Sequence, residues 1–178
     1  MKQSIFRLTL TLFLITAVVA AALAGINSIT APKIAQLKEQ KVADAIAAVL
    51  PGTATEKTDF VDATGLVEKV WQSENGYAVQ VAPAGFGGTI TMMVGIDKNG
   101  AVLGIDIITH AETASLGDVA ASKNAKGQAF RGQFVGKTGT LAVNKDGGQI
   151  DAITSATITS RAVTNGVNTA LEFVANMG

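Results

Sequence analysis

The longest apolar stretch of the chain lies near its N-terminus. Residues 8–26 carry no charge, and a helix of that length, at about 1.5 Å per residue, nearly spans a hydrocarbon core of roughly 30 Å. Lys2 and Arg7 precede the stretch, and positive charges tend to stay in the cytoplasm. The pattern predicts a single transmembrane helix in a membrane anchor over residues 1–30. It places residues 31–178, one domain, on the periplasmic or extracellular side of the cell (inner) membrane.

The same stretch leaves a second interpretation open. Ala22 and Ala24 fit the small-x-small pattern of a cleaved signal peptide. In favour of a retained anchor, the apolar run is longer than a usual signal-peptide core, and no helix-breaking residue precedes that cleavage point. Both interpretations export the domain, so they differ only in whether it stays anchored.

The spacing of apolar residues changes beyond Pro32. It becomes that of an amphipathic helix close to the membrane, and Pro51-Gly52 ends the pattern. The apolar positions are Ile34, Leu37, Val42, Ala45, Ile46 and Val49.

Short β-prone runs follow in pairs. They cover residues 67–73, 77–82, 89–96 and 101–109. Asn75-Gly76, a dipeptide that tolerates the positive φ of a tight turn, joins the first pair, and residues 97–100 join the second. Two consecutive hairpins predict an antiparallel sheet, and we assign Trp71, midway in a strand, to packing.

The C-terminal part predicts a further hairpin and a helix. Residues 140–143 and 149–153 flank a polar, glycine-containing turn, and a helix follows from Thr159 or Ser160. Its apolar face is made by Val163, Val167, Ala170, Leu171 and Val174. Strands followed by a helix, without βαβ alternation, predict an α+β domain with an antiparallel sheet flanked by helices.

Composition removes several classes of function. The chain has no cysteine and one histidine, which excludes thiolate zinc sites, iron–sulfur ligation and cysteine nucleophiles. Its 14 basic residues balance 14 acidic ones, and aromatic residues make up 5% of the chain, so nucleic acid is not an expected partner. Gly136-Lys137-Thr138 resembles the end of a P-loop, but Arg131 stands where the first glycine would be needed.

Hydroxyl groups are concentrated just before the last predicted helix. Five occur in seven residues, namely Thr154, Ser155, Thr157, Thr159 and Ser160. One such residue is explained by helix capping, and five exceed that need. A helix N-terminus also favours a phosphate group, through its free N–H groups and partial positive charge. A cap and a phosphate site are therefore both open at this point.

This segment resembles the flavin attachment motif of the FMN-binding domain family. Asp151, Thr154, Ser155, Ala156 and Thr157 match the motif in order, with Ser155 where glycine is commonest. The resemblance implies FMN bound covalently, as a phosphoester on Thr157, after a reaction made by a separate flavin transferase. It also implies that Thr154, Ser155 and the backbone around Ala156 bind the phosphate, and that Asp151 serves recognition by the transferase.

A second match lies upstream. Residues 110–118 (His-Ala-Glu-Thr-Ala-Ser-Leu-Gly-Asp) resemble the family's His-x-Glu-Thr-Pro-Gly-Leu-Gly segment, with Ala114 and Ser115 in place of Pro and Gly. The resemblance implies that Glu112, Thr113 and Leu116 line the isoalloxazine ring. Without it, Glu112 would be assigned to a turn and Leu116 to the core.

Two shorter segments resemble segments of the same family. Residues 85–88 (Gly-Phe-Gly-Gly) are similar to its glycine loop, although a plain loop explains them equally well. Residues 134–137 (Phe-Val-Gly-Lys) are similar to its Phe-x-Gly-Lys segment. This makes Lys137 a candidate charge partner for the phosphate, against the alternative of a solvated surface lysine.

Size and layout are most similar to the branch of the family formed by the G subunits of Rnf ion-translocating electron-transport complexes. The C subunits of Na⁺-translocating NADH:quinone oxidoreductases, which are usually longer, are the second choice. The expected function is a membrane-anchored electron carrier within such a translocase complex, with other membrane subunits as partners and no NADH site of its own. An exported, non-enzymatic binding module and a free-standing extracellular reductase component are the alternatives.

Overall fold

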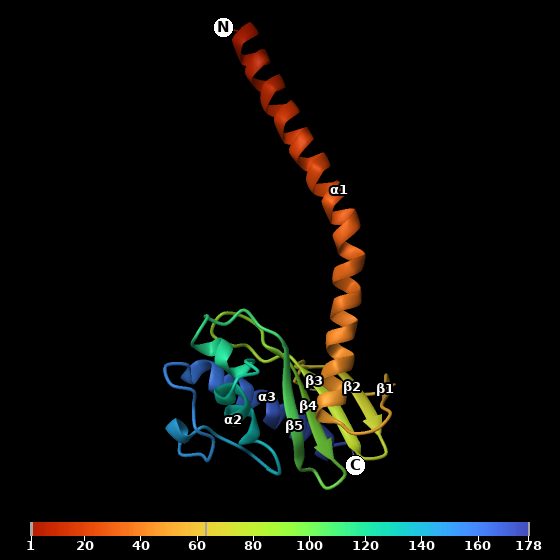
Figure 1. Cartoon of the computed structure of the whole chain (residues 1–178), viewed down its shortest axis with the longest axis vertical. Helices are drawn as coiled ribbons and strands as arrows, with labels where there is room; N and C mark the ends of the chain where they lie inside the picture. Colours follow the sequence, from red (N-terminus) through yellow and green to blue (C-terminus); the bar gives the residue numbers. More distant parts are fainter. Residues whose placement is uncertain (1, 63, 178) are drawn as a thin grey trace. The chain divides into compact units, whose positions relative to one another are not determined.

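The computed structural model describes residues 2–62 and 64–177. The chain divides into two compact units between Lys41 and Val42. A single helix, α1 (Lys2–Val49), runs through that division and past the anchor boundary predicted at residue 30. Figure 1 follows the elements in order along the chain.

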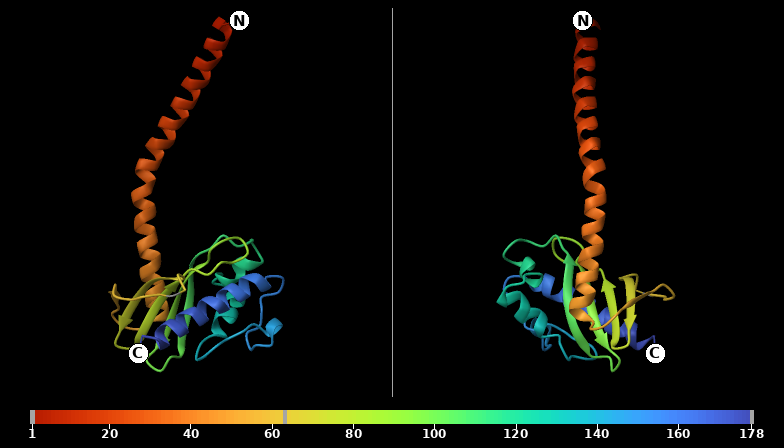
Figure 2. Two further views of the ribbon diagram at one scale, coloured as in Figure 1. Left: turned by 180° about the vertical axis from the view of Figure 1, so that it is seen from behind. Right: turned by 45° about the vertical axis from the view of Figure 1, so that its right-hand side comes forward.

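The apolar stretch forms one continuous helix with the segment that follows it. α1 contains an apolar window with a mean hydropathy of 2.3 and no buried residue, which makes it long and apolar enough to cross a membrane. The helix predicted after Pro32 is confirmed and ends at Val49, just before Pro51-Gly52, and Pro32 itself lies inside α1. The helix bends partway along (Figure 2), and proline, which removes one N–H donor, is an ordinary cause of such a bend.

Five strands form one antiparallel sheet in the order β1-β2-β3-β4-β5. They are β1 (Thr55–Lys57), β2 (Val67–Ser73), β3 (Gly76–Val81), β4 (Thr91–Asp97) and β5 (Val102–Thr109). Both predicted hairpins and the α+β class are confirmed. β1 was not predicted, because its three residues are polar and show no apolar alternation.

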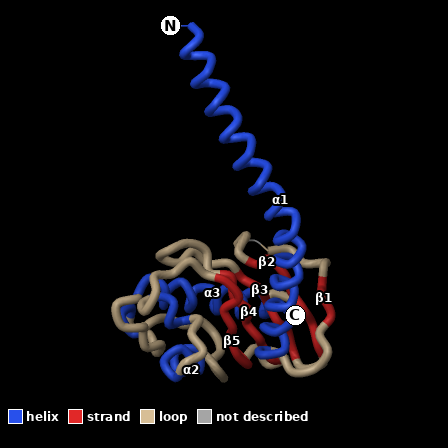
Figure 3. The backbone as a smooth tube through the Cα atoms, turned by 45° about the horizontal axis from the view of Figure 1, so that its top comes forward, coloured by secondary structure: helices blue, strands red, loops and turns tan. Residues whose placement is uncertain are grey.

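The sheet packs a helix on each face (Figure 3). One face supports α3 (Thr157–Ala175), whose Val163, Val167 and Ala170 are fully buried in the larger core. The other face receives the last two turns of α1, where Ala45 and Val49 join a second core. Its other buried members are Leu50, Trp71, Ala78 and Met93, which confirms the packing role of Trp71.

Two glycines allow the end of α1 to approach this face closely. Gly95 of β4 pairs with Gly104 of β5 in the sheet. A Cβ atom at Gly95 would lie 2.1 Å from the carbonyl oxygen of Val49, whereas at Gly104 the nearest atom of Val49 is 3.7 Å away. Gly95 is therefore a contact point at which a side chain has no room.

The third hairpin, predicted over residues 140–153, is wrong. A 3₁₀ turn, η2 (Asn144–Asp146), stands in its place, and the isolated bridge between Val143 and Ile150 is parallel. The turn is held by a bidentate ion pair, since the Arg161 guanidinium donates to both carboxylate oxygens of Asp146 at 2.7 and 2.6 Å. This contact with α3 is remote in sequence, so strand propensity alone did not reveal it.

Two short helical elements connect the sheet to α3. They are η1 (Gly117–Ala120) and α2 (Ala125–Gly132), and neither was predicted. Asn124 caps α2 by accepting a hydrogen bond from the N–H of Gly127 at 3.0 Å. Arg131 fastens α2 to η1 by donating to the carbonyl of Ala120. They bring residues 110–133 beside the N-terminal end of α3.

Candidate functional site

The last helix begins without a side-chain cap. α3 starts at Thr157, earlier than the predicted start at Thr159 or Ser160, and its N-cap residue is Ala156. The Thr159 hydroxyl donates to Glu112, and the Ser160 hydroxyl donates to the carbonyl of Ala156 at 3.0 Å. Within residues 2–62 and 64–177, no side-chain hydrogen bond caps this helix end. The interpretation of Thr159 or Ser160 as a simple helix cap is therefore wrong.

Two adjoining hollows open beside this helix end. The first, which we call the threonine hollow, has a volume of about 360 Å³ and contains Thr157 in its wall. The second, the lysine hollow, has a volume of about 710 Å³ and is lined in part by Lys126 of α2. Leu116 and Ser155 line both. The two predicted site segments thus meet at one place in the fold.

The hydroxyl-rich run separates into buried and accessible groups. Thr159 and Ser160 are buried and hydrogen-bonded within the protein. Thr154 and Ser155 are exposed, and Thr157 is half-buried. Thr157 is the first residue of α3, so its side chain stands beside N–H groups at the positive end of the helix.

Glu112 lies in the threonine hollow but does not offer free carboxylate oxygens. It is buried, and its Oε1 accepts a hydrogen bond from the N–H of Gly87 at 2.9 Å. Its Oε2 accepts from the hydroxyl of Thr159. Thr113 also lines this hollow, and its carbonyl accepts from the N–H groups of Leu116 and Asp118 in the turn that follows.

Three exposed apolar side chains surround the threonine hollow. Phe86 is 67% exposed, Ile158 51% and Leu116 41%. Exposed apolar surface of this kind favours a ligand with an apolar face. The sequence indicated Leu116 only, because Phe86 lies in a segment that a plain loop explains and Ile158 carries no polar group of the motif.

The structure places Lys137 outside both the threonine hollow and the lysine hollow. Its ammonium group donates to Oε1 of Gln149 at 2.8 Å, and it lines a separate hollow beside Gly147 and Gly148. Lys126 is the basic residue that lines the lysine hollow. It was missed because a lysine on the polar side of a short helix matches no motif.

Asp151 lies at the rim of the lysine hollow with its backbone held from both sides. Gln133 accepts from the N–H of Asp151 at 2.7 Å and donates to its carbonyl at 3.2 Å. The exposed carboxylate accepts from the side-chain amide of Asn144 at 2.9 Å. Gln133 was also missed, since it is eighteen residues away in sequence.

Two serines in this region adopt a left-handed backbone. Ser115 and Ser155 both have φ of 62°, and both line the lysine hollow. At both positions the family that these segments resemble more often has glycine, and the backbone explains why. A residue with a Cβ atom in this conformation is strained, whereas glycine is not.

We expect Ser115→Gly and Ser155→Gly each to raise the free energy of unfolding by about 0.5–1 kcal/mol, because the strain relieved exceeds the entropy that glycine adds to the unfolded chain. Urea unfolding of the full chain in detergent measures this. Ser122→Gly is the control, since Ser122 has no positive φ. This variant should have the same free energy of unfolding as the wild type or a lower one. Destabilisation by both site substitutions would contradict the explanation.

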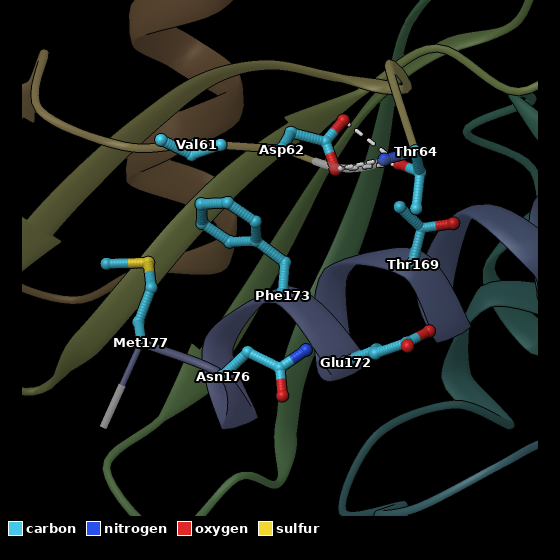
Figure 4. A pocket seen from close by; sticks show the side chains of 8 residues that line it. All are labelled: Val61, Asp62, Thr64, Thr169, Glu172, Phe173, Asn176 and Met177. Atoms are coloured by element: carbon cyan, nitrogen blue, oxygen red, sulfur yellow. Dashed lines mark hydrogen bonds between the residues drawn. The ribbon is translucent and has the colours of Figure 1, made fainter.

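A further hollow lies at the opposite end of α3 and contains none of the predicted residues (Figure 4). Asp62 there accepts hydrogen bonds from Thr64 and from the N–H of Val67. Partial burial raises the pKa of Asp62, but these hydrogen bonds outweigh it and hold the pKa below its ordinary value. The hydrogen bonds hold the segment before β2 against the start of that strand, and the edge-to-face contact of Phe60 with Phe173 joins it to α3.

Comparison with known proteins matches both parts of the chain. Residues 85–172 match the FMN-binding domain, and residues 1–49, which include all of α1, match the RnfG N-terminal region. The G subunit of an ion-translocating oxidoreductase complex from Stutzerimonas stutzeri is 34% identical, over 93% of this chain and 79% of that protein. The chain belongs to the family of G subunits of ion-translocating oxidoreductase complexes.

The names of two further members of this family specify an ion, and the two ions differ. The G subunit of a Na⁺-translocating ferredoxin:NAD⁺ oxidoreductase complex from Acetobacterium woodii is 32% identical over 97% of this chain and 93% of that protein. The G subunit of a proton-translocating ferredoxin:NAD⁺ oxidoreductase complex from Clostridium ljungdahlii is 36% identical over the same shares. The resemblance drawn from the motifs is confirmed, and the N-terminal match favours the G branch over the C branch.

Proposed function

We propose that this chain carries FMN as a phosphoester on Thr157 and relays electrons within a membrane-bound, ion-translocating oxidoreductase complex. The observation that carries the proposal is the position of Thr157. It is a half-buried hydroxyl at the uncapped start of α3, inside a hollow with three exposed apolar side chains. Membership of the G-subunit family and the FMN-binding domain match support it.

The site suits a flavin phosphate in charge and in shape. The N-terminal end of α3 offers free N–H groups and a partial positive charge, which suit one phosphodiester charge without a neighbouring cation. The exposed hydroxyls of Thr154 and Ser155 lie just ahead of the helix as further donors. Leu116 and Ile158 offer apolar surface to the flavin ring. Lys137 has no part in this arrangement.

The attachment requires an activated donor. Esterification forms a bond from the Thr157 oxygen to the FMN phosphorus, and condensation with free FMN would have to expel water. With FAD as donor, the pyrophosphate bond breaks, AMP leaves, and the threonine proton passes to a base. We assign this step to a flavin transferase, which would recognise the motif through the exposed carboxylate of Asp151.

A covalent flavin explains how this chain carries electrons. It has no cysteine for a thiol or a cluster, and a bound flavin supplies reversible electron transfer. On the outer side of the membrane a dissociated cofactor would be lost by dilution, and a covalent bond prevents that loss. The relatives' names specify sodium in one case and protons in another, so the proposal names no ion.

Visible absorption tests the proposed function. The full chain, purified in detergent from cells that also express a flavin transferase, should be yellow after denaturing gel filtration and should bleach on addition of dithionite. The same chain from cells without the transferase should be colourless. A colourless protein from both preparations would contradict the proposal and favour the exported binding module.

Cysteine labelling tests the side of the membrane. Because the chain has no cysteine, single substitutions label without background. Asn99→Cys, in the exposed turn between β4 and β5, should react with a membrane-impermeant maleimide on spheroplasts, whereas Gln3→Cys should react only after lysis. The reverse pattern would place the domain in the cytoplasm and contradict the proposed topology.

A further inference from the structure

The glycine loop presents one aromatic ring at the threonine hollow. Residues 85–88 form a tight turn closed by the N–H of Gly85, which donates to the carbonyl of Gly88 at 2.7 Å. Ala84 and Thr89 flank it as an antiparallel bridge. Phe86, between two glycines, lines the same hollow as Thr157 and is 67% exposed. Together with Leu116 and Ile158, this ring gives the hollow an exposed apolar lining.

The loop is held closely against the segment that carries Glu112. A Cβ atom at Gly85 would lie 2.3 Å from Oε1 of Glu112, and one at Gly87 would lie 2.1 Å from the carbonyl oxygen of Ala111. The N–H of Gly87 donates to the same Glu112 oxygen at 2.9 Å. Glycine is therefore required at Gly87, where backbone blocks a side chain, whereas a side chain at Gly85 would have to displace the side chains of Glu112 and Ile90.

The second oxygen of Glu112 connects the loop to α3. It accepts a hydrogen bond from Thr159, which is 2% exposed and lies in the first turn of α3, two residues after Thr157. A Cβ atom at Gly117 would lie 2.5 Å from this oxygen. A buried chain of contacts thus runs from the helix end that carries Thr157, through Glu112, to the loop that carries Phe86.

We propose that Phe86 forms an aromatic wall against the isoalloxazine ring, and that Glu112 and Thr159 are positioning residues for this wall. The inference rests on the proposed attachment of FMN to Thr157. A planar ring system in the threonine hollow covers the exposed Phe86 side chain, and offset or edge contacts between aromatic rings are favourable. Both carboxylate oxygens of Glu112 are already bonded within the protein, so Glu112 acts through the loop.

Flavin emission tests the position of residue 86. Tryptophan and tyrosine quench an excited flavin by donating an electron at van der Waals contact, and phenylalanine does so weakly. Phe86→Trp and Phe86→Tyr should therefore lower the emission per attached flavin several-fold, with attachment measured by intact mass. Val135→Trp is the matched control, since Val135 is 53% exposed and lines neither hollow. Full attachment with unquenched emission in both Phe86 variants would overturn the proposal.

A second pair of variants tests the positioning role. In the Phe86→Trp background, Thr159→Val removes the donor to Glu112, which should release the loop and restore most of the emission. Thr164→Val is the control, because Thr164 is also 2% exposed but donates its hydroxyl within α3, to the carbonyl of Ser160 at 2.9 Å. Equal emission in both double variants would overturn the role of Thr159 and Glu112.

These outcomes are separable from failure of the proposed function. If wild-type protein carries no flavin mass, the attachment itself is wrong. If wild type is flavinylated and only the quenching pattern fails, the attachment stands and the aromatic wall is wrong.

Discussion

Thr157→Ala should abolish covalent flavin completely while leaving the domain folded. The hydroxyl is the only atom of this side chain that can form the phosphoester, and the buried hydrogen bonds at this helix end are made by Thr159 and Ser160 instead. Protein co-expressed with the transferase should show no flavin mass and no fluorescent band in a denaturing gel. The urea midpoint should change little, because substitutions away from the core and from these buried hydrogen bonds are usually worth about 0.5 kcal/mol or less.

Neighbouring hydroxyls supply the controls for this result. Thr154→Ala removes an exposed hydroxyl three residues earlier and should keep the flavin attached, since that hydroxyl contributes to binding only. Thr157→Ser keeps a hydroxyl at the acceptor position and should retain attachment. Full flavin content in Thr157→Ala would identify another acceptor and contradict the assignment.

Gly95→Ala should destabilise the domain by about 2–3 kcal/mol, the cost of overpacking a close contact. The new methyl group would lie 2.1 Å from the carbonyl oxygen of Val49. That atom belongs to the backbone, which cannot move aside as a flexible side chain would. Either the last turn of α1 leaves the sheet or the strands shift. Urea unfolding of the full chain in detergent should show a lower midpoint.

Gly104→Ala is the matched control for this substitution. The two glycines face each other across β4 and β5, but at Gly104 the nearest atom is at an ordinary contact distance of 3.7 Å. We expect the free energy of unfolding to change by no more than about 1 kcal/mol, because a Cβ atom there would not clash and alanine restricts the unfolded chain. Equal destabilisation by both substitutions would contradict the close approach of α1 to Gly95.

Local signals in the sequence predicted most of the sheet. Apolar runs around Asn75-Gly76 and residues 97–100 are enough to define two hairpins, because such turns depend on neighbouring residues. Residues 140–153 have similar local signals, yet backbone hydrogen bonds close residues 143–148 into a 3₁₀ turn, which the Arg161–Asp146 ion pair joins to α3. The apolar spacing after Pro32 correctly predicted a helix that ends before Pro51, but it did not show that Pro32 lies inside one continuous helix.

The candidate site was also predicted only in part. Motif spacing brought Thr157, Leu116 and Glu112 together correctly, because the segments that carry them do meet in the fold. It could not place Lys137, whose ammonium group binds Gln149 in another hollow. It also missed Phe86, since only the three-dimensional contact of Gly87 with Glu112 brings that loop to the site.

Peptide mass spectrometry tests the central claim most directly. Trypsin cleavage after Lys145 and after Arg161 releases residues 146–161, a peptide that contains all five hydroxyls of the run. From protein flavinylated in cells, this peptide should gain the mass of FMN less one water. Fragment ions should place the added mass on Thr157. An unmodified peptide, or an added mass on any other residue, would contradict the account.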